Sequence, residues 1–90
     1  GLGDVYKRQL ICGSGVGISI AANRFSHIRA ALCYDIESTK ISRQHNDANV
    51  LCLGANNVNK DDAIVIVESF LHAQLIKEER YLRRISKLED

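Results

Sequence analysis

The chain has 90 residues and a net charge of +1, from 12 Lys and Arg against 11 Asp and Glu. This balance argues against a protein that mainly binds nucleic acid, because such binding rests on many cations that neutralise phosphates. No apolar run approaches the roughly 20 residues that span a bilayer, so we expect no nucleic-acid or membrane partner.

The absence of methionine leads us to expect a processed product or a fragment. The three cysteines, Cys12, Cys33 and Cys52, cannot all pair within one chain, and their spacing contains no C-x-x-C metal or redox motif. A reducing cytoplasm is therefore the expected compartment. Cys33 and Cys52 lie in or beside apolar runs, which predicts small core residues.

Residues 1–9 fit neither a strand nor a helix pattern, and we interpret them as a non-native leader. From residue 10 onward, a short apolar run, a polar or glycine break and a helical pattern recur three times. The apolar runs are 10–12, 28–33 and 50–53. Such runs, alternating with helices, are typical of a parallel sheet covered on both faces. The sequence predicts three βα units over 10–76 in a three-layer α/β/α, Rossmann-like parallel sheet.

Helix signals follow each run. The first helix is expected over 18–24, and Asp35 is a plausible N-cap for a second helix that ends near His45. Asn59 or Asp61 can cap the third helix, whose apolar residues recur at i, i+3, i+4 and i+7: Ala63, Ile64, Val67, Phe70, Leu71 and Leu75. The charged tail, residues 77–90, carries a narrow apolar stripe and predicts a helix that packs on another surface.

Three strands are few for an open parallel sheet, which usually has about five or six. The strand near Leu10 would also have an unpaired edge, which soluble proteins normally cover. We therefore expect this chain to be a fragment that lacks upstream strands.

The glycine-rich segment 12–17 opens the first helix from the end of the first apolar run. Alternate glycines allow a sharp turn whose N–H groups approach an anion, and a helix N-terminus adds partial positive charge. The spacing is neither a Walker A loop nor the dinucleotide motif G-x-G-x-x-G, so a simple tight turn stays open. Cys12 favours function, because a thiol in this setting should have a lowered pKa.

Two other clusters are less specific. Residues 43–49 are rich in Asn and Asp and form a turn by default, with His45 as a solvated residue near a helix end. Arg80 and Arg84, spaced i, i+4, can close on one phosphate, although composition alone favours a solvated face with Glu79–Arg83 pairing.

Together these clusters resemble the ribose-5-phosphate isomerase B family, whose relatives include galactose-6-phosphate isomerase subunits and allose-6-phosphate isomerases. The resemblance runs from about Leu10 to Ile85 and rests on three blocks in family order, 10–23, 28–31 and 42–51. The family chain begins with two βα units that are absent here. Tyr81 stands where the family commonly has a histidine, and Asn56 where it often has an arginine.

The resemblance implies an aldose–ketose isomerase that interconverts ribose 5-phosphate and ribulose 5-phosphate through an enediolate, without metal or cofactor. Cys12 would be the base, and Ser14 with the amides of the loop would hold the enediolate oxygens. His45 would open the sugar ring and Asn46 would bind substrate, while Arg80 and Arg84 would bind phosphate across a subunit interface. The expected assembly is a homodimer or tetramer. The loop residues concerned are Gly13, Gly15, Val16 and Gly17.

Three alternatives stay open. A phosphotransferase-system IIB-type carrier would phosphorylate Cys12, but it gives His45 and the tail arginines no role. An allose- or galactose-6-phosphate isomerase subunit would share the same chemistry, although the sequence His45-Asn46-Asp47 favours the ribose branch. A non-catalytic nucleotide-binding module would need an acidic residue roughly 20 residues after the loop, a place that only Asp35 could fill.

Overall fold

The computed structural model describes residues 8–89, apart from the side chains of Arg8 and Cys12. It contains three parallel strands and four helices in the order β1 (Arg8–Cys12), α1 (Val16–Ala22), β2 (Ala30–Leu32), α2 (Ile36–Asn46), β3 (Val50–Gly54), α3 (Lys60–His72) and α4 (Glu79–Glu89). The strand order is β1-β3-β2, with Arg8 and Ala30 both opposite Val50. The predicted α/β fold of three βα units and a C-terminal helix is confirmed.

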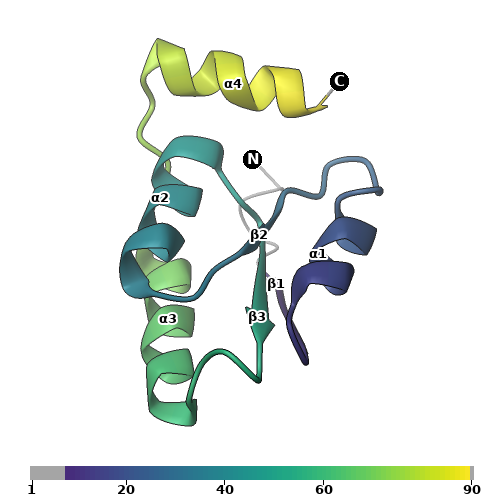
Figure 1. The fold of residues 1–90 in the computed structure, drawn as a ribbon. Coiled ribbons are helices and arrows are strands. Elements are labelled where there is room, and N and C mark those ends of the chain that lie inside the picture. The colour runs from purple at the N-terminus through teal and green to yellow at the C-terminus, as the bar shows by residue number, and fades with distance from the viewer. Residues whose placement is uncertain (1–7, 90) are drawn as a thin grey trace.

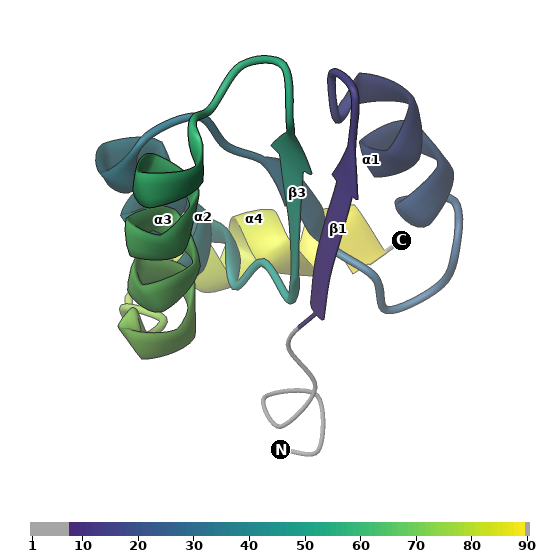
Figure 2. The same cartoon turned by 90° about the horizontal axis from the view of Figure 1, so that it is seen from below.

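Helices cover both faces of the sheet. Figure 1 shows α1 on one face and α2 with α3 on the other, and Figure 2 shows the same separation from below. The central strand β3 is buried along its whole length, because it has a strand on each side and helices on both faces. The core lies between the sheet and the α2–α3 layer and includes Cys33, Ala48, Leu51, Leu53, Ile66 and Phe70.

Capping side chains set the helix starts as the sequence predicts. The Asp35 carboxylate accepts the N–H of Ser38 at 2.7 Å at the start of α2. Hydrogen bonds from the Ser38 side chain and from its backbone N–H lower the pKa of Asp35 below its usual value. Asn59, rather than Asp61, caps α3 by accepting the N–H of Asp62 at 2.8 Å.

Several boundaries differ from those expected. β1 begins at Arg8 rather than Leu10, so two residues of the predicted leader 1–9 belong to the sheet, and 1–7 lie outside the described residues. α1 starts at Val16, two residues early, and α3 ends at His72, before Leu75. The helix predicted over residues 77–90 begins two residues later, at Glu79.

The edge of β1 that faces away from β3 is unpaired within residues 8–89. Apolar side chains lie exposed on β1, on α1 and in the turn after it: Ile11 is 63%, Ile20 62% and Phe25 71% accessible. A cavity of about 570 Å³ opens beside Leu10, Phe25 and Val50. In the same range, no helix has the length and apolar character needed to cross a membrane.

Candidate active site

The glycine loop lies at the carboxyl end of the sheet. Cys12 is the last residue of β1 and stands opposite Gly54 of β3. The carbonyl of Gly13 accepts the N–H of Asn56 at 2.9 Å, which joins this loop to the turn that follows β3. The thiol of Cys12 lies outside the described side chains, so its lowered pKa stays a prediction.

Two glycines allow this close packing. Gly15 has φ of +81°, a left-handed conformation that side chains disfavour. A Cβ at Gly15 would also lie 2.5 Å from the Leu32 side chain, and a Cβ at Gly54 would lie 2.4 Å from the Ser14 carbonyl oxygen. The loop and the end of β3 can therefore approach each other only as glycine backbones.

Gly15→Ala is expected to lower the free energy of unfolding by about 1–2 kcal/mol, because alanine in the left-handed region costs that much. Its Cβ would also stand 3.1 Å from the backbone of Leu53 and Gly54. Gly17→Ala is the matched control: no atom lies within 4 Å of its Cβ position, and alanine inside a helix is favourable by about 0.5–1 kcal/mol. Urea unfolding of both variants checks this difference, and equal stabilities would contradict it.

Two side-chain hydrogen bonds hold the loop at the start of α1. The Ser14 hydroxyl accepts the N–H of Val16 at 3.3 Å, a long bond that an anion could replace. Ser19 donates its hydroxyl to the Val16 carbonyl at 2.7 Å, which fixes the first turn of α1. The predicted loop residues are thus brought together in one place: Gly13, Ser14, Gly15, Val16 and Gly17.

His45 and Asn46 lie at the other end of the sheet. α2 starts after the carboxyl end of β2 and runs back toward the amino end of β3, so its last turn carries both residues away from the glycine loop. The five residues of β3, at about 3.3 Å each, set the two ends roughly 15 Å apart. Within one chain, the structure does not bring His45 and Cys12 together.

Arg80 and Arg84 also lie away from the loop, on α4. Figure 1 shows α4 beyond the last turn of α2, at the end of the sheet opposite the turns after β1 and β3. Both arginines are exposed. Arg80 pairs with Glu78 at 3.0 Å.

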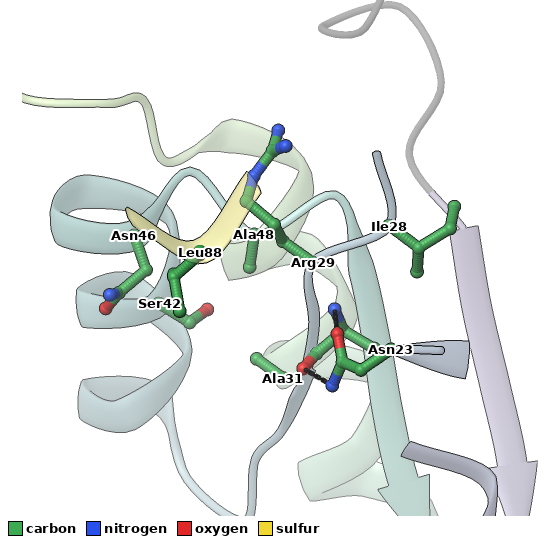
Figure 3. A pocket seen from close by; sticks show the side chains of 9 residues that line it. Asn23, Ile28, Arg29, Ala31, Ser42, Asn46, Ala48 and Leu88 are labelled. Carbon is green, nitrogen blue, oxygen red and sulfur yellow. Dashed lines mark hydrogen bonds between the residues drawn. The ribbon is translucent and has the colours of Figure 1, made fainter. Parts of the chain in front are cut away.

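A cavity of about 410 Å³ lies beside Asn46. Figure 3 shows Asn46 at one side of it and Ile28 at the other, with Arg29 and Leu88 of α4 between them. The Arg29 guanidinium is held by the carbonyl of Asp47 at 2.8 Å and by the carboxylates of Asp47 and Glu89. Arg29 thus joins α4 to the C-cap of α2 instead of filling the cavity.

Tyr81 is the site residue whose importance the sequence analysis missed. Its ring stacks on the His45 imidazole, with centroids 4.2 Å apart and planes 11° from parallel. One feature of the sequence indicates it: Tyr81 is the aromatic residue of the apolar stripe in the tail, and it directly follows Arg80.

The remaining polar groups give no metal site. Among residues 8–89, no three His, Cys, Asp or Glu side chains gather as metal ligands would. Burial raises the pKa of the Cys33 thiol, which keeps it protonated and unreactive. Cys33 and Cys52 are both buried, as the sequence predicts.

Comparison with known proteins gives consistent matches. A family model described as Ribose/Galactose Isomerase matches residues 3–88. The chain is 53% identical over 72 residues to ribose-5-phosphate isomerase B of Escherichia coli, which covers 80% of this chain and 48% of that protein. It is 46% identical over 79 residues to the probable ribose-5-phosphate isomerase B of Mycoplasma pneumoniae, covering 88% of this chain and 51% of that one.

Solved structures agree. The type B ribose 5-phosphate isomerase of Leishmania infantum superposes with a TM-score of 0.90 at 43% identity, over 92% of this chain and 54% of that one. The Trypanosoma cruzi enzyme gives a TM-score of 0.88 at 44% identity, over 90% and 54%. This chain therefore spans about half the length of the relatives that it matches.

Proposed function

The chain belongs to the ribose/galactose isomerase family, and from this premise we propose that it supplies part of the active site of an aldose–ketose isomerase acting on ribose 5-phosphate and ribulose 5-phosphate. The observation that carries the proposal is the glycine loop that follows Cys12 at the carboxyl end of β1 and is hydrogen-bonded to the turn after β3. Neither the phosphocysteine carrier nor the nucleotide-binding module is favoured by the comparisons.

The reaction moves one proton between neighbouring carbons. In the open-chain aldose, the Cys12 thiolate takes the proton from C2, and the C2–H electron pair forms a C1=C2 double bond while O1 gains negative charge. The amides of the loop and the Ser14 hydroxyl stabilise this oxyanion, which is where preorganised donors have most effect. Cys12 then returns the proton to C1, and the O2 proton passes to O1, which leaves a C2 ketone and a C1 alcohol.

Completing this site requires a second subunit. Ring opening acts on atoms one bond from C2, so the ring-opening group and the base must both lie within a few ångströms of the same sugar. His45 and Cys12 of one chain are too far apart for that. We therefore propose a homodimer in which His45, Asn46, Arg80 and Arg84 of one subunit face the glycine loop of the other.

The proposed enzyme also needs polypeptide beyond these 90 residues. The chain spans about half the length of its relatives, and the unpaired edge of β1 is bordered by exposed Ile11 and Phe25. A further strand would pair with this edge and cover part of the apolar surface. We propose the cytoplasm as its compartment, which the buried free thiol of Cys33 supports.

An isomerase assay tests the proposal. We expect turnover of ribose 5-phosphate by the chain expressed with its upstream gene segment, and little or none by the 90 residues alone. Allose 6-phosphate and galactose 6-phosphate, assayed alongside, should be poorer substrates because His45-Asn46-Asp47 follows the ribose branch. A longer chain with no turnover of any of the three would overturn the assignment, and phosphoryl transfer to Cys12 from a carrier protein would support the phosphocysteine alternative.

A further inference from the structure

We propose that Tyr81 is a positioning residue that fixes the imidazole of His45 and the guanidinium of Arg80 for catalysis. The inference rests on the isomerase function proposed above. It assigns to the aromatic ring at the start of α4 a role that goes beyond packing, because the same ring contacts both groups.

The contact between Tyr81 and His45 is close and rigid. Tyr81 is 5% accessible and is the buried residue of α4, whose other side chains are exposed or half-buried. Its ring lies nearly parallel to the imidazole of His45, with centroids 4.2 Å apart. A flat ring against the imidazole restricts the χ2 rotation of His45. The two ring nitrogens lie on the edge of the imidazole and so stay outside the stack.

Arg80 binds the same tyrosine from the neighbouring position. Its guanidinium carbon lies 4.6 Å from the centre of the Tyr81 ring, and Nη2 donates to the phenol oxygen at 2.7 Å. Nε of Arg80 donates to Glu78 at 3.0 Å. A flexible, exposed side chain is thereby held at two points, which reduces the conformational entropy that it would lose on binding a phosphate.

The backbone around Tyr81 is anchored to α2. The N–H of Ile76 donates to the carbonyl of Gln44 at 2.8 Å, next to His45, and the N–H of Tyr81 donates to Glu78 at 3.0 Å. The connection between α3 and α4 is thus tied to the helix turn that carries the histidine. Tyr81 and His45 form one unit, and misplacing a reacting group by about 1 Å can cost about 10²-fold in rate.

The two sugar phosphates distinguish positioning from packing. Ribose 5-phosphate must open its ring before C2 can lose a proton, whereas ribulose 5-phosphate has no ring to open, because its C5 oxygen carries the phosphate. Loss of the His45 orientation should therefore slow the aldose far more than the ketose. Starting from the ketose, such a variant would release the open-chain aldose, whose ring then closes in solution. The equilibrium between ribose 5-phosphate and ribulose 5-phosphate is therefore unchanged.

The first test uses NMR of the 90-residue chain. In the wild type, ring current from Tyr81 should move the His45 ring protons away from their values in the denatured chain. Tyr81→Leu should abolish that shift, Tyr81→Phe should keep it, and the exposed control Leu82→Ala should leave it unchanged. His27 and His72 serve as internal references, and unchanged amide signals of β3 show that each variant is folded.

The second test measures kinetics on the preparation found active in the isomerase assay. Tyr81→Leu should lower turnover of ribose 5-phosphate by about 10- to 100-fold and that of ribulose 5-phosphate by less than about threefold. Tyr81→Phe keeps the stack but loses the acceptor for Arg80, so its KM should rise by about two- to tenfold with kcat unchanged.

A folded Tyr81→Leu variant that keeps the wild-type His45 shifts would overturn the inference, as would equal losses of rate with both sugars. If no preparation isomerises either sugar phosphate, the proposed function fails. The role of Tyr81 in orienting His45 is then still decided by the NMR comparison, which needs no substrate.

Discussion

Replacement of Cys12 by alanine in the active preparation is expected to lower kcat for ribose 5-phosphate by about 10²- to 10⁴-fold, the range typical for a positioned base. Cys12 ends β1 opposite Gly54, where it is the proposed acceptor of the C2 proton. Alanine removes that acceptor while the glycine loop keeps its backbone amides. Substrate binding should therefore persist, with KM changed by less than about threefold.

Cys33→Ala is the matched control for this prediction. Cys33 is buried, and burial raises the pKa of its thiol, so it carries little thiolate near neutral pH. Its loss should reduce stability without lowering kcat per folded molecule. Steady-state assays give kcat for the two variants. The alkylation rate of the thiols that remain in each variant is measured beside them. A Cys12→Ala variant with full turnover would exclude Cys12 as the base.

Local patterns predicted those parts of the fold that depend on neighbours in the sequence. The apolar spacing around Phe70 and the capping side chain of Asn59 were sufficient for α3, because periodicity and caps are local properties. β2 is shorter than the apolar run 28–33 for a reason that is not local. The amide oxygen of Asn49 accepts the N–H of Arg29 at 2.8 Å, so this N–H bonds a side chain, and only the Arg29 carbonyl reaches β3, where it accepts the N–H of Val50 at 3.3 Å.

The early start of α1 has a different cause. Val16 and Gly17 already belong to α1, because the left-handed Gly15 ends the turn before them and the Ser14 hydroxyl accepts the N–H of Val16. A single residue with positive φ thus moved the helix start by two residues. Such a conformation is permitted by glycine but is not required by it, so the sequence could not place it.

The candidate site divides in the same way. The glycine loop could be predicted, since one contiguous segment builds it. The separation of His45 from that loop follows from the direction of α2, which runs from the carboxyl end of β2 back to the amino end of β3. The contact of His45 with Tyr81 joins residues 36 positions apart, and no local pattern indicates it.

Arg43 shows how a polar cluster can be structural. The sequence places it in the Asn- and Asp-rich segment 43–49, beside His45. In the structure it is 4% accessible and lies with its guanidinium carbon 5.6 Å from the centre of the Phe70 ring. It donates to the carbonyls of Ala48 at 2.6 Å and Ala73 at 3.2 Å, and pairs with Asp47 at 3.3 Å. One side chain thereby joins the ends of α2 and α3.

Arg43→Met is expected to lower the free energy of unfolding by about 2–4 kcal/mol, because methionine keeps much of the apolar packing but leaves buried acceptors without donors. That is a large part of the roughly 5–15 kcal/mol of a small domain. Arg83→Met, at an exposed position of α4, should change it by less than about 0.5 kcal/mol. Urea unfolding with a constant m-value measures both. A loss below about 1 kcal/mol for Arg43→Met would show that water replaces its hydrogen bonds, and that the junction of α2 and α3 rests on Phe70 and the apolar core alone.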